Sequence, residues 1–398
     1  MVSHLRPKMK VKKEVVAKEC IDAFSTPINL SFKSHENIFF SSHMISQEQI
    51  GKQYIPISIW RPILILSIVI GHSFAIYNGA WQYDFESGVD YIAAYNWENS
   101  FFISFQLEAF FFISGFLFWK GRYIERKLTP STYFHFIKKK VERLYIPSIV
   151  FSLLYLYFFT EPIEFKDVME ALLLGKGHLW FLPSLFWCYA IHHLFAKWGR
   201  EHLRIYLLLS FLAIYVGTGI YHFFPTIFTY WLARVTLYYF FFVLGASIRN
   251  TQVDNHIRKV YAKGRGKYYI LLFAFFFLGL WLIPILANSF SLCSESVENL
   301  INFAVSPLYA LAGILAMYMT WLFMERHNYP SRVVRIWVYL SSISFGVYVV
   351  HQFILVEVVN KYLLQLQFLT AAWAIPFILI VLGTLGSIAI VVALKKVL

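Results

Sequence analysis

The sequence predicts an all-α protein, a polytopic membrane bundle of about ten transmembrane helices with both chain ends in the cytoplasm. Of its 398 residues, 59% are hydrophobic and only 14% are charged, whereas globular domains are about 25% charged. The apolar residues fall into blocks of about 20 residues, a length that spans a bilayer as a helix. Basic residues gather in every second segment between these blocks. Lipid is therefore the solvent of this protein.

The apolar blocks define the spans in chain order. They are separated by charged segments or by breaks rich in Gly, Pro and Asn. We predict helices at residues 56–77, 100–119, 144–160, 178–196, 203–224, 228–248, 268–287, 302–323, 336–358 and 370–394.

The charge distribution predicts how these helices are oriented. Counting the N-terminal segment as the first, the odd-numbered segments hold most of the 35 Lys and Arg residues. Cytoplasmic segments carry such an excess, so both termini should face the cytoplasm. The same rule explains the net charge of +13, and we therefore expect no nucleic-acid partner.

The chain divides into two regions. Residues 1–55 are polar and Lys-rich and lack the apolar core of a signal peptide. We predict that they form a cytoplasmic extension, ordered or disordered, before a membrane-embedded domain at 56–398. The three cysteines lack CxxC or metal-type spacing, so neither a disulfide framework nor a zinc site is expected.

Ionisable residues inside a membrane span are costly and mark functional sites by default. The predicted topology places His72, Glu108, Arg234 and His351 toward the outer half of the membrane, with His178 near the outer end of its span. Each has a structural alternative: a hydrogen bond to a backbone carbonyl for His72, a contact between two helices for Glu108, helix packing for His351, and for Arg234 a side chain that extends to the headgroups.

Cations gather instead on the predicted cytoplasmic side. Arg61 begins the first span, and Lys140 and Arg143 lie at the entry to the third, where positive-inside topology accounts for many lysines. Arg61 and His72 are eleven residues apart, which places them on one face of a helix at a separation of about 16 Å. One helix face therefore joins a cytoplasmic cation to an embedded imidazole.

Five segments resemble, in order, the type-3 acyltransferase family of integral membrane proteins. The first is the Arg-x10-His pattern that Arg61 and His72 form in RPILILSIVIGH; EAFFFISGF, RLYIP, HLWFLPSLFWCY and SSISFGVYVVHQ follow. The resemblance covers about residues 56–394. The basic pair that the family often carries before the third helix is present as lysines followed by Arg143, and the N-terminal 55 residues have no counterpart.

The resemblance implies transfer of an acyl group, usually acetyl from acetyl-CoA, to a hydroxyl of a glycan. Acetyl-CoA would be a co-substrate, and neither a permanently bound cofactor nor a metal is expected. The implied partners are acyl-CoA, the glycan acceptor, the lipid bilayer and polysaccharide-assembly proteins. The implied location is the bacterial inner membrane.

Residue roles follow from the same resemblance. Imidazole suits a general base near neutral pH, and cationic side chains suit the phosphates of CoA. The candidates are His72 as base with Glu108 orienting it, Arg61, Lys140 and Arg143 for acyl-CoA, and His351, Arg234 and Trp180 for the acceptor. Trp180 has a second interpretation, as part of the aromatic belt at the membrane interface.

Two other classes of protein were weighed. An exporter of a polysaccharide or lipid-linked glycan commonly shows repeated halves with broken helices at the midplane, and the sequence has no such symmetry. A receptor would leave the shared helix face of Arg61 and His72 unexplained.

Overall fold

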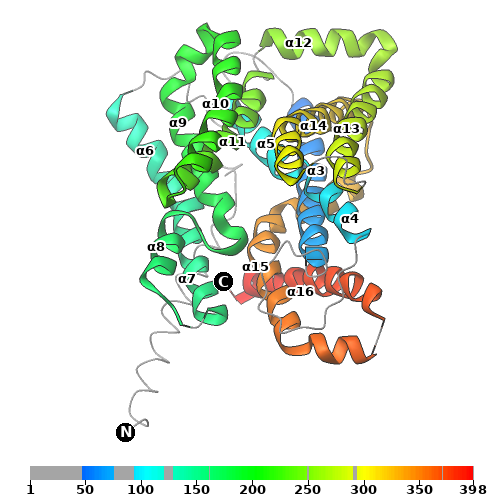
Figure 1. Cartoon of the computed structure of the whole chain (residues 1–398). Coiled ribbons are helices and arrows are strands. Elements are labelled where there is room, and N and C mark those ends of the chain that lie inside the picture. The colour runs from blue at the N-terminus through cyan, green and yellow to red at the C-terminus, as the bar shows by residue number, and fades with distance from the viewer. Residues whose placement is uncertain are drawn as a thin grey trace.

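The computed structural model describes residues 47–75, 94–120, 129–160, 162–248, 251–289, 294–369 and 371–397, and within these ranges it contains helices and no strand (Figure 1). Ten helical stretches are long and apolar enough to cross a membrane. The predicted all-α bundle and its number of spans are therefore confirmed, and the cytoplasmic position of the termini stays a prediction.

The helices follow the predicted order along the chain. Their bounds are α3 Gln47–Phe74, α4 Ala94–Ile103, α5 Gln106–Lys120, α6 Pro130–Lys140, η3 Val141–Tyr145, α7 Ile146–Phe159, α8 Phe165–Leu173, η4 Gly177–Trp180, α9 Phe181–Glu201, α10 Leu203–Phe223, α11 Ile227–Ile248, α12 Thr251–Val260, η5 Tyr261–Arg265, α13 Gly266–Ser289, α14 Glu295–Met324, α15 Ser331–Leu369, η6 Ala372–Ala374 and α16 Ile375–Val397.

Several helices differ from the predicted boundaries; α14, for example, begins at Glu295 rather than at residue 302, and α15 ends at Leu369 rather than at residue 358. The third span begins at Pro130 rather than at residue 144, because α6, η3 and α7 follow one another without a break. The second span is interrupted at Ser104 and Phe105, between α4 and α5. Helix α3 begins at Gln47, so the end of the predicted extension is helical, while residues 1–46 lie outside the described part.

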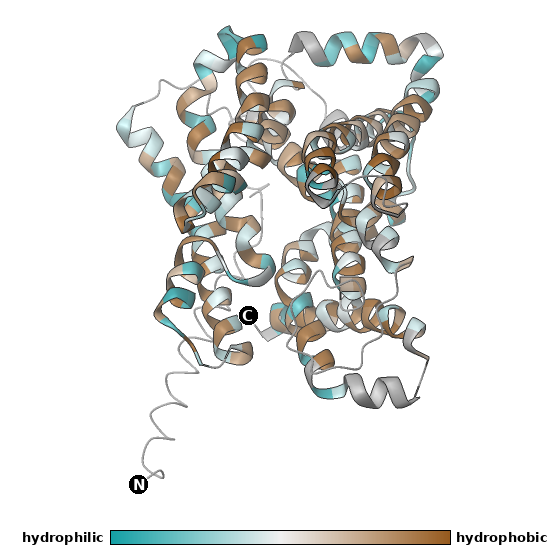
Figure 2. Cartoon of the chain, viewed as in Figure 1, coloured by the Kyte–Doolittle hydropathy of each residue, from teal (hydrophilic) through white to brown (hydrophobic). Residues whose placement is uncertain are grey.

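The spans differ in how far the bundle covers them. In α9 and α15 about two thirds or more of the span is buried, 72% and 67%, against 17% in α13 and 22% in α16. Much of α13 and α16 is hydrophobic along its length (Figure 2), as expected for helices that face lipid. Polar side chains in the membrane therefore have their place on the central helices.

Helices α5 and α11 approach each other closely through two glycines. A Cβ on Gly115 would overlap the carbonyl oxygen of Phe242, and a Cβ on Gly245 would overlap that of Phe112. Small residues allow membrane helices to bring their backbones together in this way. The contact holds the helix that carries Glu108 against the helix that carries Arg234.

Candidate active site

A buried pair of imidazoles lies where α3 packs on α15. His72, in the last turn of α3, places Nδ1 2.9 Å from Nε2 of His351. The rings are stacked, with centroids 5.1 Å apart and planes 13° apart. His351 is completely buried. The structure thus joins the predicted base to an acceptor-site candidate from another span.

The backbone contacts of His351 determine which ring nitrogens carry protons. Its Nδ1 lies 2.6 Å from the carbonyl oxygen of Tyr348 and 3.3 Å from that of Val347. A carbonyl oxygen only accepts, so Nδ1 of His351 carries the hydrogen and Nε2 of the neutral ring is an acceptor. His72 must then donate from Nδ1. The basic lone pair of His72 is therefore on Nε2, the nitrogen that can take a proton from a substrate.

A third imidazole, His178 on η4, completes the cluster. Its ring centroid lies 4.9 Å from that of His351 and 6.4 Å from that of His72. Its Nε2 donates to the carbonyl oxygen of Val349 at 3.1 Å, and its backbone N–H donates to Oε1 of Gln352 at 3.0 Å. These bonds attach η4 to α15, so the three imidazoles are held in one place by backbone contacts.

His178 was not among the predicted site residues. The signal for it in the sequence was its place in HLWFLPSLFWCY, one of the five motif segments. With Nε2 donating, Nδ1 carries the lone pair. That nitrogen is buried and has no hydrogen-bond partner within the described residues. The cluster therefore holds an imidazole acceptor, Nδ1 of His178, that accepts no hydrogen bond from the described residues.

The turn that delivers His178 depends on two glycines and an ion pair. Gly175 and Gly177 adopt the left-handed conformation, with φ of 79° and 58°, which favours glycine. Between them, Lys176 reaches Asp167 at 2.6 Å. This hydrogen bond lowers the pKa of the Asp167 carboxyl and fastens the turn to α8.

Glu108 lies in the first turn of α5, directly after the break from α4, where the helix dipole favours a negative charge. The sequence left open whether it orients His72 or joins two helices. In the structure the orienting contact comes from His351, and no hydrogen bond joins Glu108 to His72 in the described part. One Glu108 oxygen is buried without a hydrogen-bond partner there, within electrostatic range of Tyr238 and Tyr309. It can accept from a substrate hydroxyl.

The other acceptor-site candidates contact each other. The guanidinium of Arg234 lies over the Trp180 ring, 4.3 Å from its centroid, and donates to the hydroxyl of Tyr230 at 2.7 Å. Trp180 lies two residues after His178 in the chain. Its ring packs against that of Tyr238. This arrangement places a cation and an aromatic face beside the histidine cluster, which suits a polar ring such as a sugar.

Two of the predicted donor-site cations, Lys140 and Arg61, interact with one tyrosine, Tyr189 on α9. Lys140 places its ammonium 3.4 Å from the centroid of this ring, and Arg61 interacts with Tyr189 electrostatically. Arg143 is exposed on the π-helical segment η3, where its positive charge interacts electrostatically with that of Lys140. Such π segments are frequent at functional sites. Two cations from two spans thus act on one aromatic ring, with Arg143 beside Lys140. Arg61 lies about 16 Å along α3 from His72.

The remaining candidate chemistry concerns metals and thiols. No group of His, Cys, Asp or Glu in the described ranges is arranged to hold a metal ion. Cys188 is buried, with Sγ 3.9 Å from the carbonyl oxygen of Val235, and a buried apolar thiol is usually inert. Cys20 and Cys293 lie outside the described residues.

The fold and the site together define a multi-pass integral membrane protein with a buried imidazole centre and a separate cluster of cations. A family model described as an acyltransferase domain matches residues 57–394. The chain belongs to this type-3 acyltransferase family, and it is therefore a membrane acyltransferase. Neither a curated protein nor a solved structure gives a match.

Proposed function

We propose that this acyltransferase moves an acyl group, most simply acetyl, from cytoplasmic acyl-CoA to a hydroxyl of a cell-surface or lipid-linked glycan. The bacterial inner membrane is the proposed location, with polysaccharide-assembly proteins as partners. One observation carries the proposal: the His72–His351 contact leaves a basic Nε2 on the same helix as the cation Arg61. The base and the donor-site cation Arg61 are then held at a fixed separation by one helix.

The proposed reaction needs one base and no covalent relay. Nε2 of His72 takes the proton of the acceptor hydroxyl as its oxygen attacks the thioester carbonyl. The new C–O bond forms, the C–S bond breaks, and the departing CoA sulfur takes up the proton from His72. While His72 is protonated, its Nδ1–H remains hydrogen-bonded to Nε2 of His351, which holds the ring in place.

The donor would be held near the middle of α3, about three turns before His72. The phosphates of acyl-CoA are polyanionic, and Arg61, Lys140 and Arg143 supply three positive charges near Tyr189. A guanidinium binds phosphate through two parallel hydrogen bonds. The extended arm of CoA that bears the thioester then has to cover about 16 Å between helices to reach His72.

The proposal predicts that donor and acceptor are used on opposite faces of the membrane. Sealed vesicles from cells that make the protein and its glycan are given radiolabelled acetyl-CoA. Inside-out vesicles, which expose the cytoplasmic face, should incorporate label into the enclosed glycan. Right-side-out vesicles should do so only after detergent opens them, because acetyl-CoA does not cross the bilayer.

Vesicles from cells with the His72→Ala variant provide the control, since they retain the glycan but should take up no label. Incorporation by intact right-side-out vesicles would show that the donor site faces outward and that the predicted topology is inverted. Label on a glycan that remains on the cytoplasmic face would contradict transfer across the membrane.

Arg61 allows a separate test of the donor site. Arg61→Lys keeps the charge but loses the planar fork that binds phosphate, so we expect KM for acyl-CoA to rise about tenfold with a smaller change in kcat, corresponding to about 1.4 kcal/mol. Steady-state kinetics of the purified protein measure both constants. Arg335→Lys, on the same predicted side, is the matched control. An unchanged KM would mean that Arg61 does not bind the donor and that the positive-inside rule alone explains its position.

A further inference from the structure

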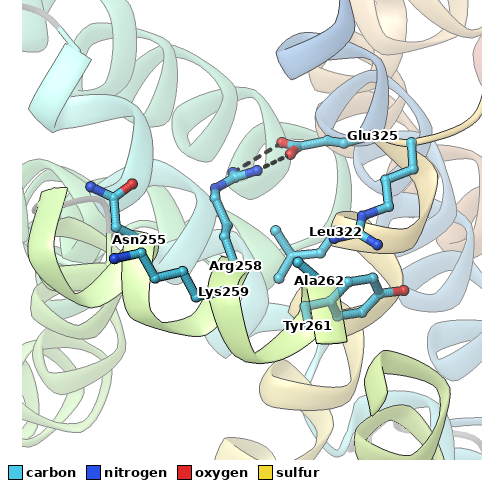
Figure 3. A pocket seen from close by; sticks show the side chains of 8 residues that line it. Asn255, Arg258, Lys259, Tyr261, Ala262, Leu322 and Glu325 are labelled. Carbon is cyan, nitrogen blue, oxygen red and sulfur yellow. Dashed lines mark hydrogen bonds and ion pairs between the residues drawn. The ribbon is translucent and has the colours of Figure 1, made fainter. Parts of the chain in front are cut away.

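A second basic site lies away from the imidazole cluster, beneath the crosswise helix α12. A pocket of about 450 Å³ opens between α12, η5 and the end of α14 (Figure 3). None of its lining residues belongs to the histidine cluster or to the cations around Tyr189. The pocket is lined by Asn255, Arg258, Lys259, Tyr261, Ala262, Leu322, Glu325 and Arg326.

One wall of this pocket is a hydrogen-bonded network of one guanidinium and two carboxylates. Arg258 donates from Nε to Asp254 at 2.7 Å and from both terminal nitrogens to the carboxylate of Glu325. Nε1 of Trp321 donates to the same carboxylate at 2.7 Å, and the Tyr318 hydroxyl donates to Asp254 at 2.7 Å. The acidic groups are thus already satisfied, and the network fixes α12 on α14 rather than attracting a cation.

Two cations of the pocket are left without a counterion. Within the described ranges, neither Lys259 nor Arg326 forms an ion pair, and both are exposed. The guanidinium of Arg326 is held over the Tyr261 ring, 4.6 Å from its centroid. A stacked guanidinium keeps its N–H groups at its edge, where they can donate to an anion in the plane. The pocket thus presents two cations outside the ion pairs beside the amide of Asn255, and together with the network of Arg258, Asp254 and Glu325 they leave a net positive charge.

The position of the pocket indicates its depth in the membrane. Helix α12 connects the span that ends at Ile248 to the span that begins at Gly266, and it runs crosswise to α13 at the edge of the structure (Figure 1). It is largely hydrophilic where α13 is apolar (Figure 2). Residues at such a junction lie at the level of the lipid headgroups.

We propose that this pocket binds the phosphate of an anionic phospholipid headgroup. Lys259 and Arg326 would hold the phosphate, and the apolar wall formed by Leu322, Ala262 and Tyr261 would receive the first carbons of the lipid. Basic pockets at this depth between transmembrane helices suit lipid headgroups. A lipid is favoured over a soluble phosphate because the bilayer supplies it at this level and because three of the eight lining residues form an apolar wall.

Lipid titration of the purified full-length protein in detergent tests the assignment. Phosphatidylglycerol, phosphatidylcholine and inorganic phosphate serve as probes, with retained lipid measured by native mass spectrometry. The pocket variant Lys259→Gln/Arg326→Gln is compared with Lys267→Gln/Arg332→Gln, which removes the same charge from exposed residues that do not line the pocket. Phosphatidylglycerol should bind the pocket variant about 30-fold more weakly than wild type, from about 1 kcal/mol per cation, and the comparison variant within about threefold.

Each other outcome overturns the proposal. Equal losses in both double variants would show a non-specific effect of net charge. Equal binding of phosphatidylcholine would show that the pocket does not select a headgroup with net negative charge. Displacement of phosphatidylglycerol by inorganic phosphate at millimolar concentration would identify a soluble anion instead. Both pocket residues lie outside the ion-pair network, so unfolding temperatures without lipid should equal that of wild type. If the double variant unfolds, Arg326→Gln alone gives the same comparison against Arg332→Gln.

Discussion

Replacement of His72 by Ala is expected to abolish acyl transfer while the protein remains folded and inserted. Loss of a positioned general base typically costs 10²–10⁴-fold in rate. Two other imidazole lone pairs remain in the cluster, on Nδ1 of His178 and on Nε2 of His351. Both rings are fixed to α15 through their other nitrogens, so neither is free to move to the position of His72. The acetyl content of the proposed acceptor glycan and the rate at which the purified protein turns over the proposed acyl-CoA donor measure the effect.

A second buried histidine separates chemistry from packing. His192 on α9 is 4% exposed and contacts the Tyr206 hydroxyl at 3.0 Å, so His192→Ala leaves a comparable cavity away from the cluster. It should keep most of the activity at equal expression, with unfolding temperature reporting the packing cost for both variants. If the His72→Ala protein acetylates its glycan normally, His72 takes no part in the mechanism.

The span pattern could be predicted from the sequence because the bilayer imposes it. Each helix must carry enough apolar residues to cross the hydrocarbon, and charges are confined to the connections. The shared face of Arg61 and His72 was predictable for a similar reason, since helical geometry alone relates residues on one helix. The structure keeps both residues on α3.

The partner of His72 could not be predicted, because it arises from packing between helices distant in sequence. His72 and His351 are separated by 279 positions along the chain, and no periodicity within a helix reports such a contact. The sequence offered Glu108 as the orienting group because its depth matched. Depth fixes a level in the membrane but not a direction, and the break between α4 and α5 directs Glu108 elsewhere.

For the proposed donor site, too, the residues could be predicted from the sequence but their contacts could not. The sequence identified Arg61, Lys140 and Arg143 by their charge and by the predicted topology. That Lys140 and Arg61 both act on Tyr189 depends on how α6 and α9 pack, which charge alone does not determine. The π-helical segment η3, which carries Arg143, could not be predicted either. A π turn contains one residue more than an α turn, and no residue composition marks it.

Replacement of His351 by Phe should slow transfer by at least about 10²-fold, close to the loss caused by His72→Ala. Phe fills a similar volume but has no nitrogen to accept the hydrogen from Nδ1 of His72, so the basic lone pair is no longer held on Nε2. Loss of the group that fixes a catalytic histidine tautomer costs up to about 10⁴-fold in a serine protease. We expect the loss in kcat, with KM for acyl-CoA unchanged, because the donor cations are distant.

Two further variants distinguish positioning from packing. His351→Gln restores an acceptor oxygen at the end of the side chain, so it should recover part of the activity that Phe loses. The double variant His72→Ala/His351→Phe should be no slower than His72→Ala alone, because a residue that acts only through His72 has nothing left to orient. A merely structural His351 would instead give additive losses, equal activity in the Gln and Phe variants, and a fall in unfolding temperature that tracks the fall in rate. Additive losses would therefore remove His351 from the reaction and leave the tautomer of His72 to be fixed by another group.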